Sequence, residues 1–112
     1  MKVSDIIRIT GFKVISQITD TEREVQGCYI SDLLSWVMGH AAAHNVWITI
    51  MSHLNIVAVA SLLDLACIIV SEGEQPDSDT LARAAEENVI ILSADCTSFE
   101  AAKKLIDAGL PL

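Results

Sequence analysis

Residues 46–70 of this 112-residue chain read VWITIM, SHL, NIVAVASLL, DL and ACIIV in succession. The first and last blocks, residues 46–51 and 66–70, are almost entirely apolar and have the length of strands. The middle block, residues 55–63, has the length of a helix. Strands without polar alternation are typical of a sheet that is buried on both faces. The order strand, helix, strand therefore predicts two parallel strands joined by a right-handed crossover.

The same alternation of apolar runs and helical patterns extends on both sides of this unit. The further strands and helices that it predicts are residues 27–30, 33–38, 78–88, 89–92 and 98–108. Helices that connect parallel strands cover the faces of the sheet, so we expect a three-layer α/β fold with a mostly parallel sheet of about four βα units. A length of 112 residues is typical of one domain, and we expect residues 1–112 to form a single unit.

The N-terminal part of the chain interrupts this rhythm. A short helix is predicted to start at Ser4 or Asp5 and to end at Gly11. A short strand over residues 13–17 and a polar loop over residues 19–24 are expected to follow.

The ends of two later helices also have sequence signals. Thr97 and Glu100 have the spacing of a capping box, in which each side chain accepts a hydrogen bond from the other residue's backbone N–H, and predict the start of the last helix. Gly39 is expected to end the helix that covers residues 33–38.

The composition argues against several classes of partner. The chain has 15 acidic and 7 basic residues, a net charge of −8, and scattered basic residues. Because nucleic acids and anionic membranes are bound by clustered lysines and arginines, we expect neither as a partner. Asp5 and Arg8 interrupt the apolar stretch that a signal peptide would have near the N-terminus. We therefore expect a cytoplasmic protein. Three cysteines without a CxxC pair predict reduced thiols rather than a disulfide framework or a zinc knuckle.

Each of the four predicted parallel strands is followed by a serine. The carboxyl ends of parallel strands meet helix N-termini at one edge of the sheet, where α/β proteins bind ligands and where anions are favoured. We therefore expect a site for a small anionic ligand at this edge. Its candidate residues are Ser31, Ser52, His53, Asn55, Ser71, Glu72, Gly73, Ser93, Asp95, Thr97 and Ser98. The alternative is that these are ordinary helix caps and turn residues.

A complete set of catalytic or metal-binding residues is not visible in the sequence. His40 and His44 are four residues apart, but Gly39 is expected to end the helix before them, and only His53 remains as a third zinc ligand. Cys96 precedes a helix, a position that lowers a thiol's pKa, but it has only His53 as a potential base. The phosphate-binding loop of ATP-dependent enzymes is absent. We expect no catalytic residue, no metal and no cofactor.

The predicted helix over residues 55–63 carries no charged residue and is apolar nearly all round. A surface helix of a small monomer normally has a polar stripe. We therefore expect a homodimer in which this helix meets its copy through Val57, Ala60 and Ser61. The alternative is that the N-terminal helix of the same chain covers it.

The order of these elements is similar to that of a known family. Residues 25–110 resemble the DRTGG domain family, whose members look like the N-terminal domain of HPr kinase/phosphorylase and occur within longer phosphotransacetylases. The likeness is carried by residues 46–49, 55–60, 66–70 and 90–93, by Glu72-Gly73 with Pro76-Asp77, and by Thr97 with Phe99-Glu100. The resemblance implies the α/β fold of that family and a regulatory or ligand-sensing role. In HPr kinase the phosphate-binding loop belongs to a separate domain, so the resemblance does not imply kinase activity.

The residues that name the family are different in this chain. Ser52-His53 stand where Asp-Arg would follow a strand, and Ser71-Glu72-Gly73 stand where Thr-Gly-Gly would follow the next, with one glycine kept. The leading hypothesis is a non-catalytic regulatory or ligand-sensing domain, dimeric, that binds a small anionic metabolite or nucleotide at the carboxyl edge of the sheet. A protein–protein interaction module without a small-molecule ligand is the alternative. A Cys- or His-dependent enzyme is the third hypothesis.

Overall fold

The two apolar runs over residues 46–51 and 66–70 form the centre of the sheet. In the computed structural model, which describes residues 1–17 and 20–112, they are β3 (Val46–Thr49) and β4 (Cys67–Val70), joined by α3 (Asn55–Leu63). The strands are parallel, with Val46 opposite Cys67, and every residue of both is buried. The predicted strand–helix–strand unit is therefore confirmed.

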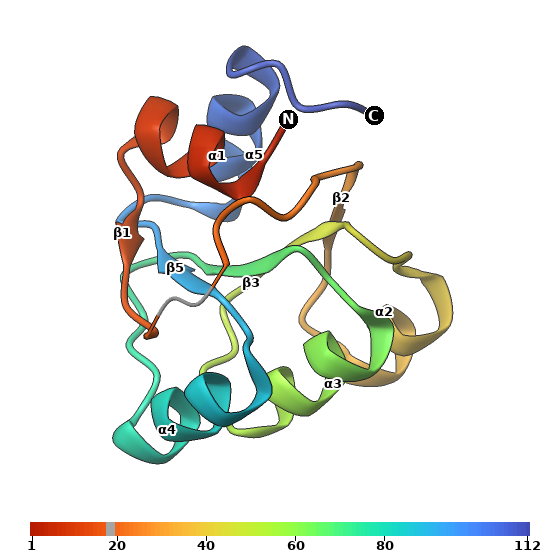
Figure 1. Ribbon diagram of the computed structural model, residues 1–112, viewed down its shortest axis with the longest axis vertical. Helices are drawn as coiled ribbons and strands as arrows, with labels where there is room; N and C mark the ends of the chain where they lie inside the picture. The colour runs from red at the N-terminus through yellow and green to blue at the C-terminus, as the bar shows by residue number, and fades with distance from the viewer. Residues whose placement is uncertain (18–19) are drawn as a thin grey trace.

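Three shorter strands complete the sheet that the described residues form. β2 (Cys28–Ile30) pairs in parallel with β3, and β5 (Ile91–Ser93) pairs in parallel with β4. β1 (Lys13–Val14) pairs antiparallel with β5. The resulting order of the five strands is β1-β5-β4-β3-β2, so β1 and β2 lie at opposite edges (Figure 1).

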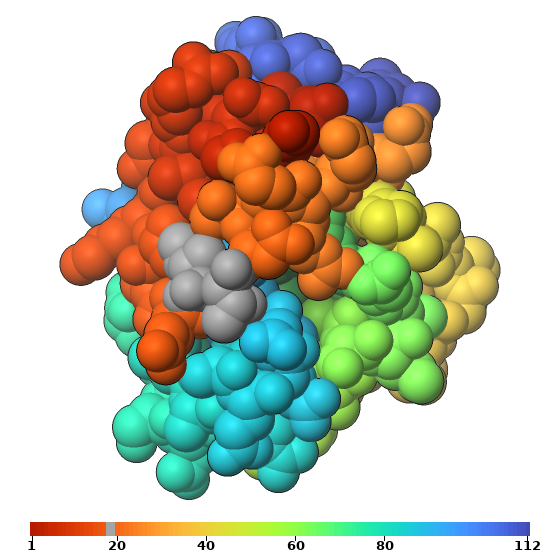
Figure 2. All heavy atoms as spheres, in the orientation of Figure 1, coloured from red at the N-terminus to blue at the C-terminus, as the bar shows by residue number. Residues whose placement is uncertain are grey.

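Helices cover both faces of this sheet. α1 (Val3–Thr10) and α5 (Ser98–Asp107) lie on one face, and α2 (Leu34–His40), α3 and α4 (Ser78–Glu87) lie on the other (Figure 1). Alternate residues of the central strands divide between two cores, one under α1 and α5 and the other above α2, α3 and α4. In the space-filling view the red N-terminal and blue C-terminal segments lie side by side at one end, and the green and cyan segments fill the other (Figure 2). The expected three-layer α/β fold with a mostly parallel sheet is confirmed.

Some element boundaries differ from those that the sequence predicts. α1 starts at Val3 rather than at Ser4 or Asp5, and β1 is limited to Lys13–Val14. Beyond β1 the chain continues along β5 through the Ser16 hydroxyl, which accepts a hydrogen bond from the Ile91 backbone N–H at 2.8 Å. Within the polar loop expected over residues 19–24, Thr19 lies outside the described residues.

α2 does not end at Gly39, as expected, but one residue later at His40. The capping box of α5 is confirmed: the Thr97 hydroxyl accepts from the Glu100 backbone N–H and the Glu100 carboxylate accepts from the Thr97 backbone N–H, both at 3.1 Å. The hydrogen bond from the Thr97 backbone N–H to the Glu100 carboxylate lowers the pKa of the Glu100 carboxyl group.

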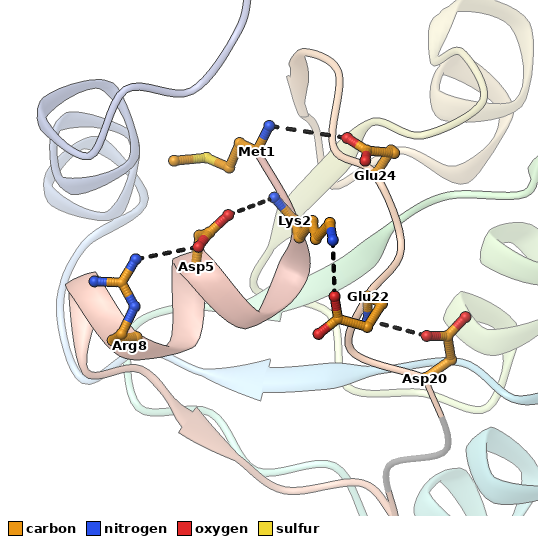
Figure 3. Close-up of polar contacts among 7 residues, drawn as sticks. All are labelled: Met1, Lys2, Asp5, Arg8, Asp20, Glu22 and Glu24. Atoms are coloured by element: carbon orange, nitrogen blue, oxygen red, sulfur yellow. Dashed lines mark hydrogen bonds and ion pairs between the residues drawn. The ribbon is translucent and has the colours of Figure 1, made fainter.

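A network of exposed polar contacts attaches α1 to the segment that follows β1 (Figure 3). Lys2 contributes twice, because its backbone N–H donates to Asp5 at 2.9 Å and its ammonium group pairs with Glu22 at 2.9 Å. Arg8 also pairs with Asp5, at 3.1 Å. Exposed ion pairs each stabilise the fold only slightly, but these contacts give both Lys2 and Arg8 a carboxylate partner nearby. No helix in the described ranges has both the length and the apolar character to cross a membrane.

Candidate functional site

The carboxyl ends of the central strands are joined by hydrogen bonds. The Ser71 backbone N–H donates to the Thr49 carbonyl at 3.0 Å, and the Ser71 and Ser98 hydroxyls share a hydrogen bond of 2.7 Å. Ser71 is completely buried. The Ser71 and Ser98 hydroxyls thus link the end of β4 to the start of α5.

The serines that follow β2 and β3 are also engaged within the chain. The Ser31 hydroxyl accepts from the Leu33 backbone N–H at 3.2 Å, which is the geometry of a turn. The Ser52 carbonyl accepts from the Thr80 hydroxyl at 3.2 Å. Next to them, one Asp32 carboxylate oxygen accepts from the Thr49 hydroxyl at 2.8 Å and from the Ile50 backbone N–H at 2.9 Å.

A cavity of about 450 Å³ opens at the other end of this edge, beside β1 and β5. It is bounded by the end of α1, the start of β1, the loops that follow β4 and β5, and one turn of α5. The residues that line it are Thr10, Gly11, Phe12, Lys13, Gly73, Gln75, Ser93, Asp95 and Lys104. We call this space the lysine cavity.

The lysine cavity contains part of the site that the sequence suggests. Of the predicted residues it brings together Gly73, Ser93 and Asp95. The remaining candidates do not line it: Ser31, Ser52, His53, Asn55, Ser71, Glu72, Thr97 and Ser98.

The two cations of the cavity were missed by sequence reasoning. Lys13 reaches it because β1 pairs antiparallel with β5 and places Lys13 opposite Ser93. Lys104 reaches it from the second turn of α5. The spacing of Lys104 from the Thr97 cap gives its position on the helix, but only the packing of α1 beside α5 forms the wall that it faces.

The pairing of the basic residues sets these two lysines apart. The chain has 7 basic residues. In the described part of the chain, five of them lie within 4.0 Å of a carboxylate: Lys2, Arg8, Arg23, Arg83 and Lys103. The two without such a partner there, Lys13 and Lys104, both line the lysine cavity.

The local structure explains why Lys104 has no carboxylate partner. One helical turn earlier, Glu100 is engaged in the capping box with Thr97. One turn later, Asp107 pairs with Lys103 at 2.6 Å. The Lys104 ammonium nitrogen instead lies 5.7 Å from the centre of the Phe12 ring, within the range of a cation–π contact.

The loop after β4 supplies the opposite wall. Glu72 and Gly73 both have left-handed backbone angles, with φ of 63° and 71°. Their backbone N–H groups donate to the carbonyls of Cys96 and Ala94, at 2.7 and 3.3 Å, which attaches this loop to the one after β5. A Cβ at position 73 would lie 3.2 Å from an Asp95 carboxylate oxygen, so glycine allows the close approach of the two loops.

The cysteines are not activated. Burial raises the pKa of the Cys28 and Cys67 thiols to about 12. Partial burial also raises the pKa of Cys96, against the opposing influence of the Lys104 charge. This direction is opposite to the one that a nucleophilic thiolate requires.

The rate of alkylation measures the reactivity of these thiols directly. In the folded protein at pH 7 we expect iodoacetamide to modify Cys96 alone, more slowly than free cysteine, because the thiolate fraction is small. Mass spectrometry over time would count the modified thiols, with Cys96→Ser as the unreactive control and urea-unfolded protein as the fully reactive one. A rate above that of free cysteine would instead favour a nucleophilic Cys96.

The interface that the sequence suggests on α3 needs correction. Val57 and Ala60 are 0% and 2% exposed, because they pack into the core shared by α2, α3 and α4. Of the three expected interface residues only Ser61 is exposed. The alternative of an N-terminal cover is wrong, because α1 lies on the opposite face of the sheet, beside α5 (Figure 1).

Comparison with known proteins gives a structural relative. No family model matches the chain, and no curated protein matches it. The fold is similar to a crystal structure of the CBS and DRTGG domains of the regulatory region of Clostridium perfringens pyrophosphatase, complexed with the activator diadenosine tetraphosphate. The TM-score is 0.74 at 15% sequence identity, over 97% of this chain and 47% of that chain. The chain therefore spans about half of that relative, and the likeness supports a DRTGG-like fold.

Proposed function

We propose that this chain is a non-catalytic regulatory domain that binds a small anionic metabolite or nucleotide in the lysine cavity. The observation that carries the proposal is that Lys13 and Lys104, the two basic residues without a carboxylate partner in the described chain, line the same cavity. In a protein of net charge −8, an anion needs such a local concentration of positive charge.

The remaining lining residues match a phosphorylated ligand with hydroxyl groups. The Ser93 and Gln75 side chains offer donors to phosphate oxygens. The Asp95 carboxylate is an acceptor, as ribose hydroxyls require. A volume of about 450 Å³ lies within the range of small-molecule sites. A nucleotide or a phosphorylated sugar would therefore find complementary groups on both sides of the cavity.

The structural relative supports a regulatory role with this class of ligand. That structure contains a regulatory region in complex with an activator, diadenosine tetraphosphate, which is a nucleotide polyphosphate. The raised pKa of Cys96 also supports binding rather than nucleophilic catalysis. Free cysteines fit the cytoplasmic setting that we propose for this domain.

A thermal-shift and calorimetric titration tests the proposal. We expect pyrophosphate, ATP or diadenosine tetraphosphate to raise the melting temperature, whereas adenosine, which lacks phosphate, does not. A ligand at 100 times its dissociation constant stabilises the folded state by about 2.7 kcal/mol, or roughly 10 °C for a domain of this size.

Two outcomes of this titration would contradict the proposal. An equal shift with adenosine would show that recognition does not depend on the anion. No shift with any anionic compound at millimolar concentration would favour the protein–protein interaction module instead.

A further inference from the structure

The charges of this protein are unevenly distributed along the chain. Residues 33–63 contain no Asp, Glu, Lys or Arg, although the chain as a whole has 22 such residues, 15 acidic and 7 basic. This charge-free segment forms α2, β3 and α3, which are adjacent elements of the fold. One continuous part of the molecule, 31 residues long, therefore carries no Asp, Glu, Lys or Arg side chain.

Exposed apolar side chains are concentrated in the same segment. Among residues 1–17 and 20–112, eleven large hydrophobic residues are exposed, and six of them belong to these 31 residues. These six are Leu33, Trp36, Met38, Ile50, Leu54 and Leu62. Single exposed apolar residues need no explanation, but their accumulation where charges are missing is typical of an interaction surface.

An aromatic ridge lies at the border of this surface, where His40 of α2 meets Tyr29 of β2. The ring centres of Trp36 and His40 are 4.2 Å apart, and those of His40 and Tyr29 are 6.4 Å apart. The His40 Nδ1 atom lies 2.9 Å from the Trp36 carbonyl, which orients the imidazole ring. Trp36 is 53% exposed and Leu33, one turn earlier, is 59% exposed. The ridge is thus an ordered stack of rings with a wide face towards solvent.

The ridge runs beside an open edge of the sheet. Tyr29 belongs to β2, which pairs with β3 on one side and with no other strand of the described chain. The lysine cavity is lined in part by the start of β1. β1 lies at the opposite edge of the sheet from β2 (Figure 1). A partner on the ridge would therefore leave the cavity accessible.

We propose that a second copy of this chain covers the aromatic ridge in a two-fold symmetric contact. Each copy carries a net charge of −8, so two copies repel each other when charged surfaces meet. The charge-free segment is where they can approach without opposing carboxylates. A two-fold axis places the same patch on both sides, so each ridge meets an equally uncharged surface.

Light scattering on purified protein tests this interface. At about 100 µM we expect the wild-type chain to have twice its single-chain mass of 12.1 kDa. Trp36→Glu or Leu33→Asp places two like charges across the axis and is expected to raise the dissociation constant at least 100-fold. Circular dichroism would verify that each variant is folded. We expect both variants to fold, because the Trp36 and Leu33 side chains are exposed.

Ile106→Glu is the matched control, because Ile106 is 58% exposed but lies on α5, on the opposite face of the sheet from α2. We expect this variant to remain a dimer. Higher salt should strengthen the wild-type dimer, because it screens the repulsion between the two acidic copies. A wild-type monomer, a dimeric Trp36→Glu variant, a monomeric Ile106→Glu variant or a dimer weakened by salt would each overturn the proposal. None of these outcomes depends on ligand binding in the lysine cavity.

Discussion

Replacing Trp47 by alanine is expected to lower the free energy of unfolding by about 3–5 kcal/mol. Trp47 is a central residue of β3, is completely buried and packs against the core of α2, α3 and α4. The substitution removes the largest fully buried side chain of the protein and leaves a cavity that the surrounding strands cannot close. It also removes the indole N–H that donates to the Ser31 carbonyl at 2.9 Å, so the end of β2 loses one of its links to β3. For a domain whose total stability is about 5–15 kcal/mol, this loss is a large fraction.

Urea denaturation at one fixed protein concentration measures this loss. Trp47→Phe keeps most of the buried volume but not the hydrogen bond, so its cost is expected to be smaller. Phe99→Ala is the control for an aromatic side chain outside the core, because Phe99 is 80% exposed, and it should change stability by less than about 0.5 kcal/mol. If Trp47→Ala cost no more than Phe99→Ala, the inward orientation of Trp47 would be wrong.

The centre of the fold is predictable from the sequence because burial leaves a direct signal there. The runs over β3 and β4 lack polar alternation, and only strands covered on both faces can tolerate this. The start of α5 is predictable for a similar reason, since the Thr97 and Glu100 side chains bond within one turn. In both cases the interactions that define the element are local in sequence or determined by composition.

The orientation of α3 shows why an apolar helix is ambiguous. Its lack of a polar stripe suggests a partner outside the chain, but α3 lies in one layer between α2 and α4 (Figure 1). A helix with a neighbour on each side and a sheet beneath it buries three sides. Val57 and Ala60 are buried by these contacts within the chain. The sequence of the helix alone does not distinguish such intramolecular contacts from contacts with another molecule.

The lysine cavity was only partly predictable because it depends on a contact between distant segments. Gly73, Ser93 and Asp95 follow strands, and the carboxyl-edge rule finds such residues. Lys13 and Lys104 come from an antiparallel edge strand and from a helix interior, which that rule does not cover. Their approach follows from the pairing of β1 with β5 and the packing of α1 against α5.

Lys104→Glu is expected to weaken binding of pyrophosphate or ATP about 100-fold. A charge-assisted hydrogen bond contributes about 1.5–3 kcal/mol, and a carboxylate at this position adds repulsion to the lost attraction. The Lys104 side chain is exposed and has no carboxylate partner within 4.0 Å in the described chain, so the fold should tolerate the substitution. Isothermal titration at constant salt would measure the affinity, and Lys13→Glu should have a similar effect from the other wall.

Arg83→Glu separates local recognition from the overall charge of the protein. It changes the net charge by the same amount, but Arg83 lies on α4, does not line the lysine cavity and pairs with Glu86 at 3.6 Å. Since long-range attraction depends on total charge and is screened within about 10 Å at ordinary salt, Arg83→Glu should change the affinity by less than about 3-fold. Equal losses in the two variants would mean that the anion responds only to the general field, and that the cavity does not select it. A loss confined to Lys104→Glu and Lys13→Glu would place the bound anion between these two lysines.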